Sequence, residues 1–442
     1  MTGSWPLILA LWGAGLGAAM QFAKFAVIFD LLGGIYPEGG AALGWLVSMI
    51  GVIGILLGAV AAMLVSKLRY RRSLLWALWL GAAVSLVEAL LPPLPVMFLL
   101  RLIEGASHLA LVVAAPTLIA QIATDTQRGL VLTLWGTFFG IAFAMMVWFG
   151  RPLALSFGIP ALFVFQAAYM AAFAFYFSPR LRRLPDEGAV QEISVASMLA
   201  VHKSIYRSAR ISAPAIGWLF YTFCFVALLT VLPPFLDPSV RGLVMGAMPL
   251  VGIAVSMTLG VGLLRVMPAV QVVVVGFALS ALCMIWLWFV PAGVVACLAL
   301  AGVLGLIQGA SFAAVPELNH NPTAQSQANG AMAQMGNLGN TLGTPVMAFA
   351  LVGWGYPSLP VLAGVAFVLG LILHLLLARL RRNTSCLLFV HIFALENPAA
   401  APMSGRNDGG PPWLSKRISK SAAHANTISR TSMWTFHATS WW

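Results

Sequence analysis

The amino-acid sequence predicts an all-α membrane protein with about 12 transmembrane helices in two pseudo-symmetric six-helix bundles. Of its 442 residues, 61% are hydrophobic and only 8% are charged, which is too little charge to cover the surface of a soluble protein. Uncharged stretches of roughly 20 residues, the length needed to cross a bilayer core, recur along the chain. They are continuously apolar and do not alternate with polar residues, which indicates helices and not the strands of a barrel.

The first half of the chain contains six such stretches. They are expected at about residues 6–31, 43–66, 73–92, 96–121, 130–150 and 159–178. The first lacks the basic flank of a cleavable signal peptide and is interpreted as a retained helix. Proline-rich turns such as the one at residues 92–95 mark helix ends. Residues 1–178 are therefore expected to form the N-terminal bundle.

The longest hydrophilic segment between apolar runs, residues 179–212, is expected to be a linker loop on the cytoplasmic side. Six further helices follow, at about residues 214–235, 242–264, 269–290, 294–316, 329–353 and 358–380. They would form the C-terminal bundle, residues 213–382. From residue 383 the composition changes to Ser, Thr, His and Trp with little periodicity, which predicts a disordered cytoplasmic tail. The tail is either regulatory or an extension without a role.

A short internal repeat relates the two halves. Residues 102–107 read Leu-Ile-Glu-Gly-Ala-Ser, and residues 306–311 read Leu-Ile-Gln-Gly-Ala-Ser. The offset of 204 residues corresponds to six predicted helices. A repeat at the midpoint of the hydropathy pattern is typical of transporter folds built from duplicated halves.

The positive charges lie in alternate loops, and this predicts the orientation. If both termini are cytoplasmic, the cytoplasmic side receives most of the basic residues, and the opposite loops receive only Arg151 and Arg241. The positive-inside rule then places the chain as a multi-pass protein in a bacterial-type inner membrane. The same distribution argues against nucleic acid as the partner of the +12 net charge.

The sequence carries no recognisable catalytic or cofactor motif. There is no Walker Gly-x-x-x-x-Gly-Lys, no His-Glu-x-x-His and no Gly-x-Ser-x-Gly. Three of the four cysteines lie in apolar stretches, and none forms a Cys-x-x-Cys pair. We therefore expect a protein that is not an enzyme and that has no catalytic residues, no cofactor and no metal site.

Between the second and third helices, residues 62–72 read Ala-Met-Leu-Val-Ser-Lys-Leu-Arg-Tyr-Arg-Arg. With the two halves and the basic linker, this resembles the major facilitator superfamily, which usually carries Gly-x-x-x-Asp-x-x-Gly-Arg-Arg there. The chain departs from that motif at Ala62, Ser66 and Arg69. The resemblance implies a cytoplasmic gate loop with the basic residues Lys67, Arg69, Arg71 and Arg72. It also implies two bundles that transport a solute by alternating access.

The fourth helix carries a candidate proton-coupling group. The family pattern Arg-x-x-x-Gly is met by Arg101 and Gly105, and the resemblance implies that this Arg takes part in proton coupling in some members. Arg101, Glu104 and His108 share one helix face because their spacing is i, i+3, i+7. Ionisable residues inside a span usually face a cavity or a partner. The alternative is a structural ion pair of Arg101 with Glu104 or with Glu88.

Polar residues on three other helices are candidate substrate contacts. Gln21 and Lys24 lie on the first helix, Gln308 on the tenth occupies the position equivalent to Glu104, and Asn337, Asn340 and Thr341 form part of a polar stripe on the eleventh. Lys24 could instead pair with a carboxylate, and the stripe could instead join helices through its amides and small residues.

These observations predict a monomeric secondary transporter of a small, polar or anionic organic solute, coupled to protons, with the lipid bilayer as its surroundings. The alternatives are a passive facilitator and a drug or metabolite efflux pump. A membrane protein without transport activity is the least supported alternative, because the internal repeat would serve no purpose in it.

Overall fold

The structure is all-helical in the residues that it describes. The computed structural model covers residues 5–58, 61–180 and 195–396, with side chains given for most of them up to Arg382. Ten helical segments of this part of the chain are long and apolar enough to cross a membrane. The more polar helices α6 and α18 complete the 12 predicted spans. The prediction of an all-α membrane protein is confirmed.

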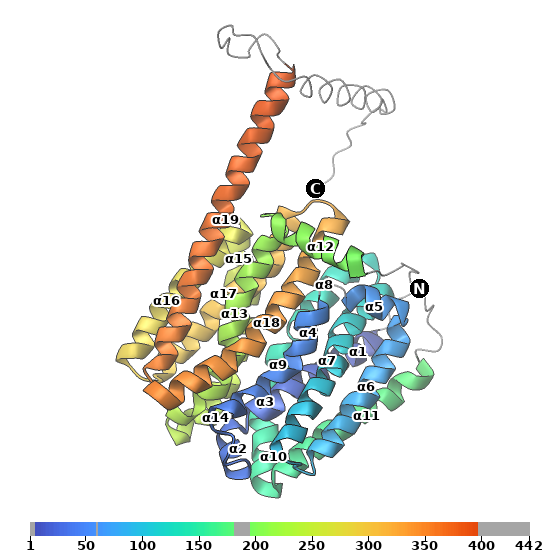
Figure 1. Ribbon diagram of the computed structural model, residues 1–442, viewed down its shortest axis with the longest axis vertical. Helices are drawn as coiled ribbons and strands as arrows, with labels where there is room; N and C mark the ends of the chain where they lie inside the picture. The colour runs from blue at the N-terminus through green and yellow to red at the C-terminus, as the bar shows by residue number, and fades with distance from the viewer. Residues whose placement is uncertain (1–4, 59–60, 181–194, 397–442) are drawn as a thin grey trace. The chain divides into compact units, whose positions relative to one another are not determined.

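The N-terminal half begins with α1 and ends with α11 (Figure 1). Two of its spans are interrupted, and we call them segment 2 (η1 to α5) and segment 5 (α8 to α10). The elements are α1 (Trp5–Ala26), α2 (Phe29–Ile35), η1 (Gly40–Leu43), α3 (Gly44–Ser48), η2 (Met49–Gly51), α4 (Val52–Leu57), α5 (Ala61–Lys67), α6 (Tyr70–Glu88), α7 (Leu94–Ile122), α8 (Asp125–Gly136), α9 (Phe138–Met145), η4 (Met146–Gly150), α10 (Arg151–Phe157) and α11 (Ile159–Arg180).

The C-terminal half follows the linker helix α12 (Val195–Arg207). Its interrupted span, which we call segment 8, consists of α14, η7 and α15. The elements are α13 (Ser212–Val231), η6 (Pro233–Phe235), α14 (Pro238–Val255), η7 (Ser256–Gly260), α15 (Val261–Leu264), α16 (Ala269–Phe289), α17 (Val294–Leu318), α18 (Pro322–Trp354) and α19 (Ser358–Glu396).

Several predicted boundaries differ from the structure by four residues or more, among them those of the first, fifth and last spans. The first helix, expected to reach residue 31, ends at Ala26, because Arg151 Nη1 binds the carbonyl of Val27 at 2.5 Å and Leu31 N–H bonds to Ile28 O. The fifth span, expected to end at residue 150, continues as α10 after the π-helical turn η4. Pro152, which has no N–H, accounts for the irregular turn before it. The last helix, expected to end at residue 380, continues to Glu396. Two predicted segments fall on residues that the structure does not describe: residues 181–194 of the linker and residues 397–442 of the tail.

The internal repeat occupies equivalent places in the two halves. A Cβ atom added to Gly105 on α7 would lie 2.5 Å from Ile50 O in segment 2, and one added to Gly309 on α17 would lie 2.4 Å from Ser256 Oγ in segment 8. Each repeated glycine thus allows the fourth helix of its half to cross the second helix closely. Both crossings fall at an irregular turn, η2 in one half and η7 in the other.

Segment 2 and α18 form one contact between the halves. The glycines of segment 2 that face α18 are Gly44, Gly51, Gly54 and Gly58. Two hydrogen bonds accompany them, from Ser48 Oγ to Asn340 O at 3.0 Å and from Gln334 Nε2 to Ile55 O at 2.9 Å. Segment 5 and segment 8 form a second contact, in which Trp148 Nε1 donates to Gly242 O at 3.0 Å. All three acceptors are backbone carbonyls.

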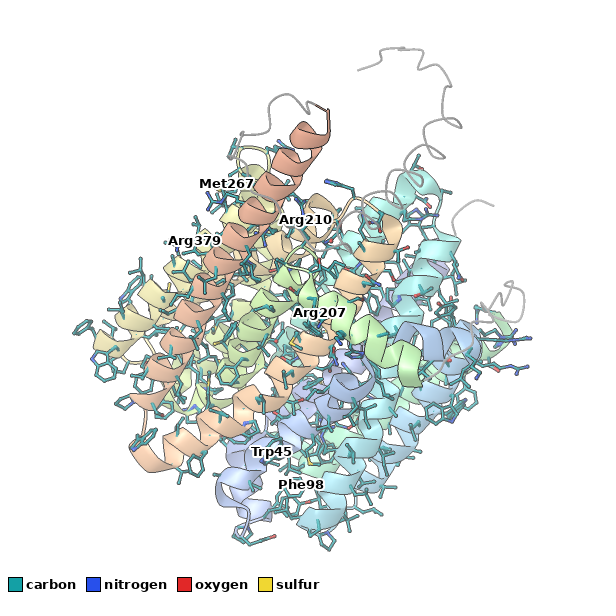
Figure 2. All side chains as sticks on the ribbon, turned by 45° about the horizontal axis from the view of Figure 1, so that its top comes forward. Trp45, Phe98, Arg207, Arg210, Met267 and Arg379 are labelled. Carbon is teal, nitrogen blue, oxygen red and sulfur yellow. The ribbon has the colours of Figure 1, made fainter. Side chains whose placement is uncertain are left out.

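The linker helix α12 defines one end of the spans, which we call the linker end; the other is the distal end. Ile205 of α12 is buried against Ala215 and Ala331 of the C-terminal half. Tyr206 of α12 donates a hydrogen bond to Gln334 Oε1 at 2.9 Å. Figure 2 shows Arg210 and Arg379 toward the linker end and Trp45 and Phe98 toward the distal end.

Candidate functional site

Lys24 lies in the last turn of α1 and is completely buried. Its ammonium donates to Ser85 Oγ at 2.7 Å, to Glu104 Oε1 at 2.7 Å and to Glu88 Oε2. An ammonium has three N–H donors, so each one has a partner. The alternative interpretation, in which Lys24 pairs with carboxylates, describes its contacts in this structure.

Arg101 of α7 is also completely buried, and its guanidinium joins three elements. Nε donates to Leu46 O at 2.6 Å, Nη2 donates to Gln21 O at 2.9 Å, and Nη1 donates to Glu104 Oε2. Leu46 lies just before the irregular turn η2, where the regular helical pattern is broken. Arg101 therefore supplies a donor to a carbonyl next to the break in segment 2. Its guanidinium also lies 4.5 Å from the centre of the Phe25 ring.

Lys24, Glu88, Arg101 and Glu104 form what we call the charge quartet. All four side chains have 0% exposure, and their formal charges cancel. Burying isolated charges costs several kcal/mol each, so such a group persists only when the charges are paired and hydrogen-bonded. The quartet ties α1, α6 and α7 together inside the N-terminal half.

Uncharged polar groups continue from the quartet along α1. Gln21 Nε2 donates to Ser107 Oγ at 3.0 Å, and Ser107 Oγ donates to Ala77 O at 2.7 Å. His108 Nδ1 lies 3.0 Å from Ala18 O. Because a carbonyl only accepts, Nδ1 of His108 carries the hydrogen in this contact and Nε2 is left as an acceptor. Gln21, Arg101, Glu104 and His108 are thus brought together as neighbours in one polar region.

A chain of aromatic rings leads from His108 to the C-terminal half. His108 packs edge-on against Phe22, Phe22 contacts Phe139 on α9, and Phe139 contacts Phe225 on α13. Phe225 then stacks on Tyr221, which stacks on Trp218. These rings connect the polar region of one half with the facing helix of the other, so at this level the contact between the halves is aromatic.

The predicted substrate residues of α17 and α18 lie away from the quartet. Asn337 and Thr341 are buried against segment 2, where they face Gly54 and Gly51. Gln308 is partly exposed, and its Nε2 approaches Gly136 O of segment 5 at 3.5 Å. Asn340 Oδ1 is buried without a hydrogen-bond partner. The polar stripe of α18 therefore lies at the contact between the halves, and Thr341 Oγ1 is also buried without a hydrogen-bond partner.

The predicted gate residues Lys67, Arg69, Arg71 and Arg72 lie at the linker end of segment 2 and α6. Arg69 has a positive φ of 67°, a conformation that favours glycine. It occupies the position where the resemblance implied glycine, so the backbone there has kept a turn that suits a glycine. The side chains of Ala62 and Ser66 are outside the described residues.

Glu88 is the functional candidate that sequence reasoning placed only as a possible partner of Arg101. It ends α6 and contacts Lys24. In the sequence, Glu88 stands out as a carboxylate near the end of the third apolar stretch, at a depth in the membrane similar to that of Arg101. Among the described residues, no three His, Cys, Asp or Glu side chains gather into a group that could hold a metal ion.

Comparison with solved structures identifies the same fold in the fucose:proton symporter FucP of E. coli. An alanine variant of FucP aligns with a TM-score of 0.60 and 16% sequence identity, over 85% of this chain and 99% of FucP. FucP in the outward conformation aligns with a TM-score of 0.60 and 15% identity, over the same shares of the two chains. At this identity the likeness concerns the fold alone. No curated protein sequence matches the chain.

A sequence model of the Major Facilitator Superfamily matches residues 7–318, which is more than half of the 442 residues. The match begins two residues into α1, includes the rest of the N-terminal half and extends through α17. It confirms the resemblance found in the sequence and the prediction of a transporter that is not an enzyme. The chain belongs to the major facilitator superfamily of membrane transporters.

Proposed function

We propose that this transporter moves a small, polar or anionic organic solute by alternating access and couples that movement to protons. The charge quartet is the observation that carries the proposal. Four ionisable side chains without any exposure are costly inside a span, and such residues commonly belong to ion or substrate pathways. His108, one turn from Glu104 along α7, adds an imidazole whose ring nitrogens can hold a proton.

Gln308 and Asn340 are the best-placed substrate contacts of the predicted set. Gln308 is partly exposed beside segment 5, and Asn340 presents a buried carbonyl oxygen that has no partner. A solute held between the halves could use both amides. Lys24 is fully engaged within the quartet and Asn337 and Thr341 are packed against glycines, so their participation would require a rearrangement of these contacts.

A passive facilitator is the second candidate, because the quartet is also a complete structural clamp. Both cations are hydrogen-bonded and the formal charges cancel. In that case the quartet would hold α1, α6 and α7 together and would never take up a proton.

Transport in proteoliposomes separates the two candidates. A thermal-shift screen of carboxylates, amino acids and sugars, with fucose included because FucP has the same fold, would first identify a stabilising solute. Its radiolabelled form is then followed with and without an imposed pH gradient and a protonophore. We expect gradient-driven accumulation that the protonophore abolishes. If Glu104→Gln and His108→Ala both retain gradient-driven transport, the proposed coupling group is wrong.

We further propose that the linker end faces the cytoplasm of a bacterial-type inner membrane and that the protein acts as a monomer. The described basic residues near the linker end support this orientation through the positive-inside rule. The distal end has the acidic residues Asp30, Glu38 and Asp237 together with Arg151 and Arg241.

A further inference from the structure

The two carboxylates of the charge quartet are held unequally. Glu104 accepts a hydrogen bond on each oxygen, from Lys24 on Oε1 and from Arg101 on Oε2. Glu88 accepts from Lys24 on Oε2 only. Its Oε1 is buried without a hydrogen-bond partner, and Arg101 Nη1 lies 3.8 Å from it. One oxygen in the quartet is therefore unsatisfied, and it belongs to Glu88.

Within the charge quartet, a proton costs the least free energy on the carboxylate oxygen that accepts no hydrogen bond. A proton on either oxygen of Glu104 would displace a charge-assisted hydrogen bond, whereas a proton on Glu88 Oε1 displaces none. Two carboxylates that share one site favour the uptake of a proton by one of them. The geometry points to Glu88 as the proton-binding residue of this transporter, with Glu104 remaining ionised between Lys24 and Arg101.

Charged groups from two helices and one tyrosine surround Glu88. The charged groups that face it are Lys24 from α1 and Arg101 and Glu104 from α7. Tyr36, between α2 and η1, lies over the same region and donates a hydrogen bond to Pro92 O at 2.8 Å. Burial and the charges of Glu88 and Glu38 raise the pKa of Tyr36 to about 12. Tyr36 is therefore a neutral phenol, close enough to Glu88 for the two groups to interact.

Protonation changes the charge of the quartet in a way that favours an anion. In the unprotonated quartet two cations balance two carboxylates. A proton added to Glu88 Oε1 forms a neutral carboxyl group, and the quartet then has one positive charge in excess. An anionic solute in the same half would neutralise that charge. The inference rests on the proposed proton coupling and names the residue that binds the proton and the class of substrate that it favours.

Infrared difference spectroscopy on the purified, reconstituted full-length protein tests this assignment without any substrate. The spectrum is recorded while the pH changes across the neutral range, and the carbonyl stretch of a protonated carboxyl group is followed. The matched pair is Glu88→Asp and Glu104→Asp, because each variant keeps the carboxylate and its charge. We expect the wild-type band to change frequency in Glu88→Asp and to stay in place in Glu104→Asp. Glu88→Gln should lack the band.

Three outcomes would overturn the assignment: no such band in the wild type, a band unchanged in Glu88→Asp, or a band that moves in Glu104→Asp. If Glu88→Gln does not fold, the two aspartate variants decide alone. The result is independent of the transport assay. A pH gradient that fails to drive transport would contradict the proposed coupling, whereas a band that belongs to another residue would contradict only the role of Glu88.

Discussion

Arg69 occupies a backbone conformation that suits glycine better. Its φ of 67° lies in the left-handed region, and it directly precedes the first residue of α6. A non-glycine residue there costs on the order of 1–3 kcal/mol. Because the side chain is exposed, its removal loses little packing. We expect Arg69→Gly to raise the apparent melting temperature, with a gain of about 1 kcal/mol after the extra freedom of glycine in the unfolded chain is counted.

Arg72→Gly is the matched control, because it removes the same charge three residues later. Arg72 is exposed as well, but it lies within the first turn of α6. Glycine there weakens the helix by up to about 1 kcal/mol relative to ordinary residues. The two variants should therefore shift the melting temperature in opposite directions, as measured by intrinsic tryptophan fluorescence. Equal shifts would show that the strain at Arg69 is absent.

Lys24 should be far more important for stability than its single charge suggests. Lys24→Met would leave Glu88 and Glu104 buried with only Arg101 to balance them. Removal of one partner from a buried ion pair costs on the order of 3–5 kcal/mol. We expect a large loss of thermal stability in Lys24→Met and a substantial recovery in Lys24→Met/Glu88→Gln, which removes one charge of each sign.

Detergent-solubilised protein measured by thermal unfolding is sufficient for this comparison. If Lys24→Met unfolds at the wild-type temperature, the loss of one cation from the quartet does not leave a costly unbalanced charge. A double variant that is no more stable than the single one would indicate that Lys24 acts through its packing among Phe25 and Phe163, whose ring centres lie 5.9 and 5.5 Å from Nζ.

The sequence predicted the quartet only in part, and the reason is geometric. Helical spacing places Arg101 and Glu104 on the same face of α7, and they are in contact. The pairing of Lys24 with Glu88 and Glu104 depends on how α1 and α6 pack beside α7, which no spacing within one helix encodes. The free oxygen of Glu88 follows from the same packing, so it could not be found from the sequence.

At the scale of the elements, the contact between segment 2 and α18 is built on glycine. A Cβ atom at Gly51 would lie 2.2 Å from Thr341 Oγ1 and 3.0 Å from Asn337 O. A helical pattern predicted one polar face on α18, but it could not reveal that the neighbour of this face is a row of glycines on segment 2. The close approach explains why Asn337 and Thr341 are buried.

This geometry predicts that Gly51→Ala destabilises the protein. The added methyl group would meet a hydroxyl group and a backbone carbonyl of α18, so the two elements would have to separate. We expect a loss of about 1–3 kcal/mol, as for other overpacked contacts. Thermal unfolding measures the loss, and a second substitution, Thr341→Ala, should recover part of it by removing the atom at 2.2 Å.

Gly262→Ala in α15 is the control for the added methyl group. No atom lies within 4 Å of a Cβ at Gly262, so the added methyl group meets no neighbour. The higher helix propensity of alanine should then stabilise this variant by up to about 1 kcal/mol. A Gly51→Ala variant that is as stable as Gly262→Ala would mean that segment 2 and α18 do not pack as closely as described.

On the scale of the whole molecule, the two ends of the spans differ strongly in charge. The described basic residues toward the linker end are Lys67, Arg69, Arg71, Arg72, Arg128, Arg180, Lys203, Arg207, Arg210, Arg265, Arg379, Arg381 and Arg382. The distal loops carry Arg151 and Arg241, and Arg151 is paired with Asp30 at 2.6 and 2.7 Å. Each basic residue near an anionic cytoplasmic leaflet contributes about 1 kcal/mol, so the asymmetry favours one orientation clearly.

Cysteine labelling in intact cells tests that orientation. Glu38 in the distal loop and Lys203 on α12 are both exposed, so Glu38→Cys and Lys203→Cys offer one thiol at each end. Cys224, Cys283 and Cys297 are buried, and Cys386→Ser removes the fourth cysteine. We expect a membrane-impermeant maleimide to label Glu38→Cys in intact cells and Lys203→Cys only after permeabilisation. The reverse pattern would place the linker end outside and would contradict the orientation inferred from the basic residues.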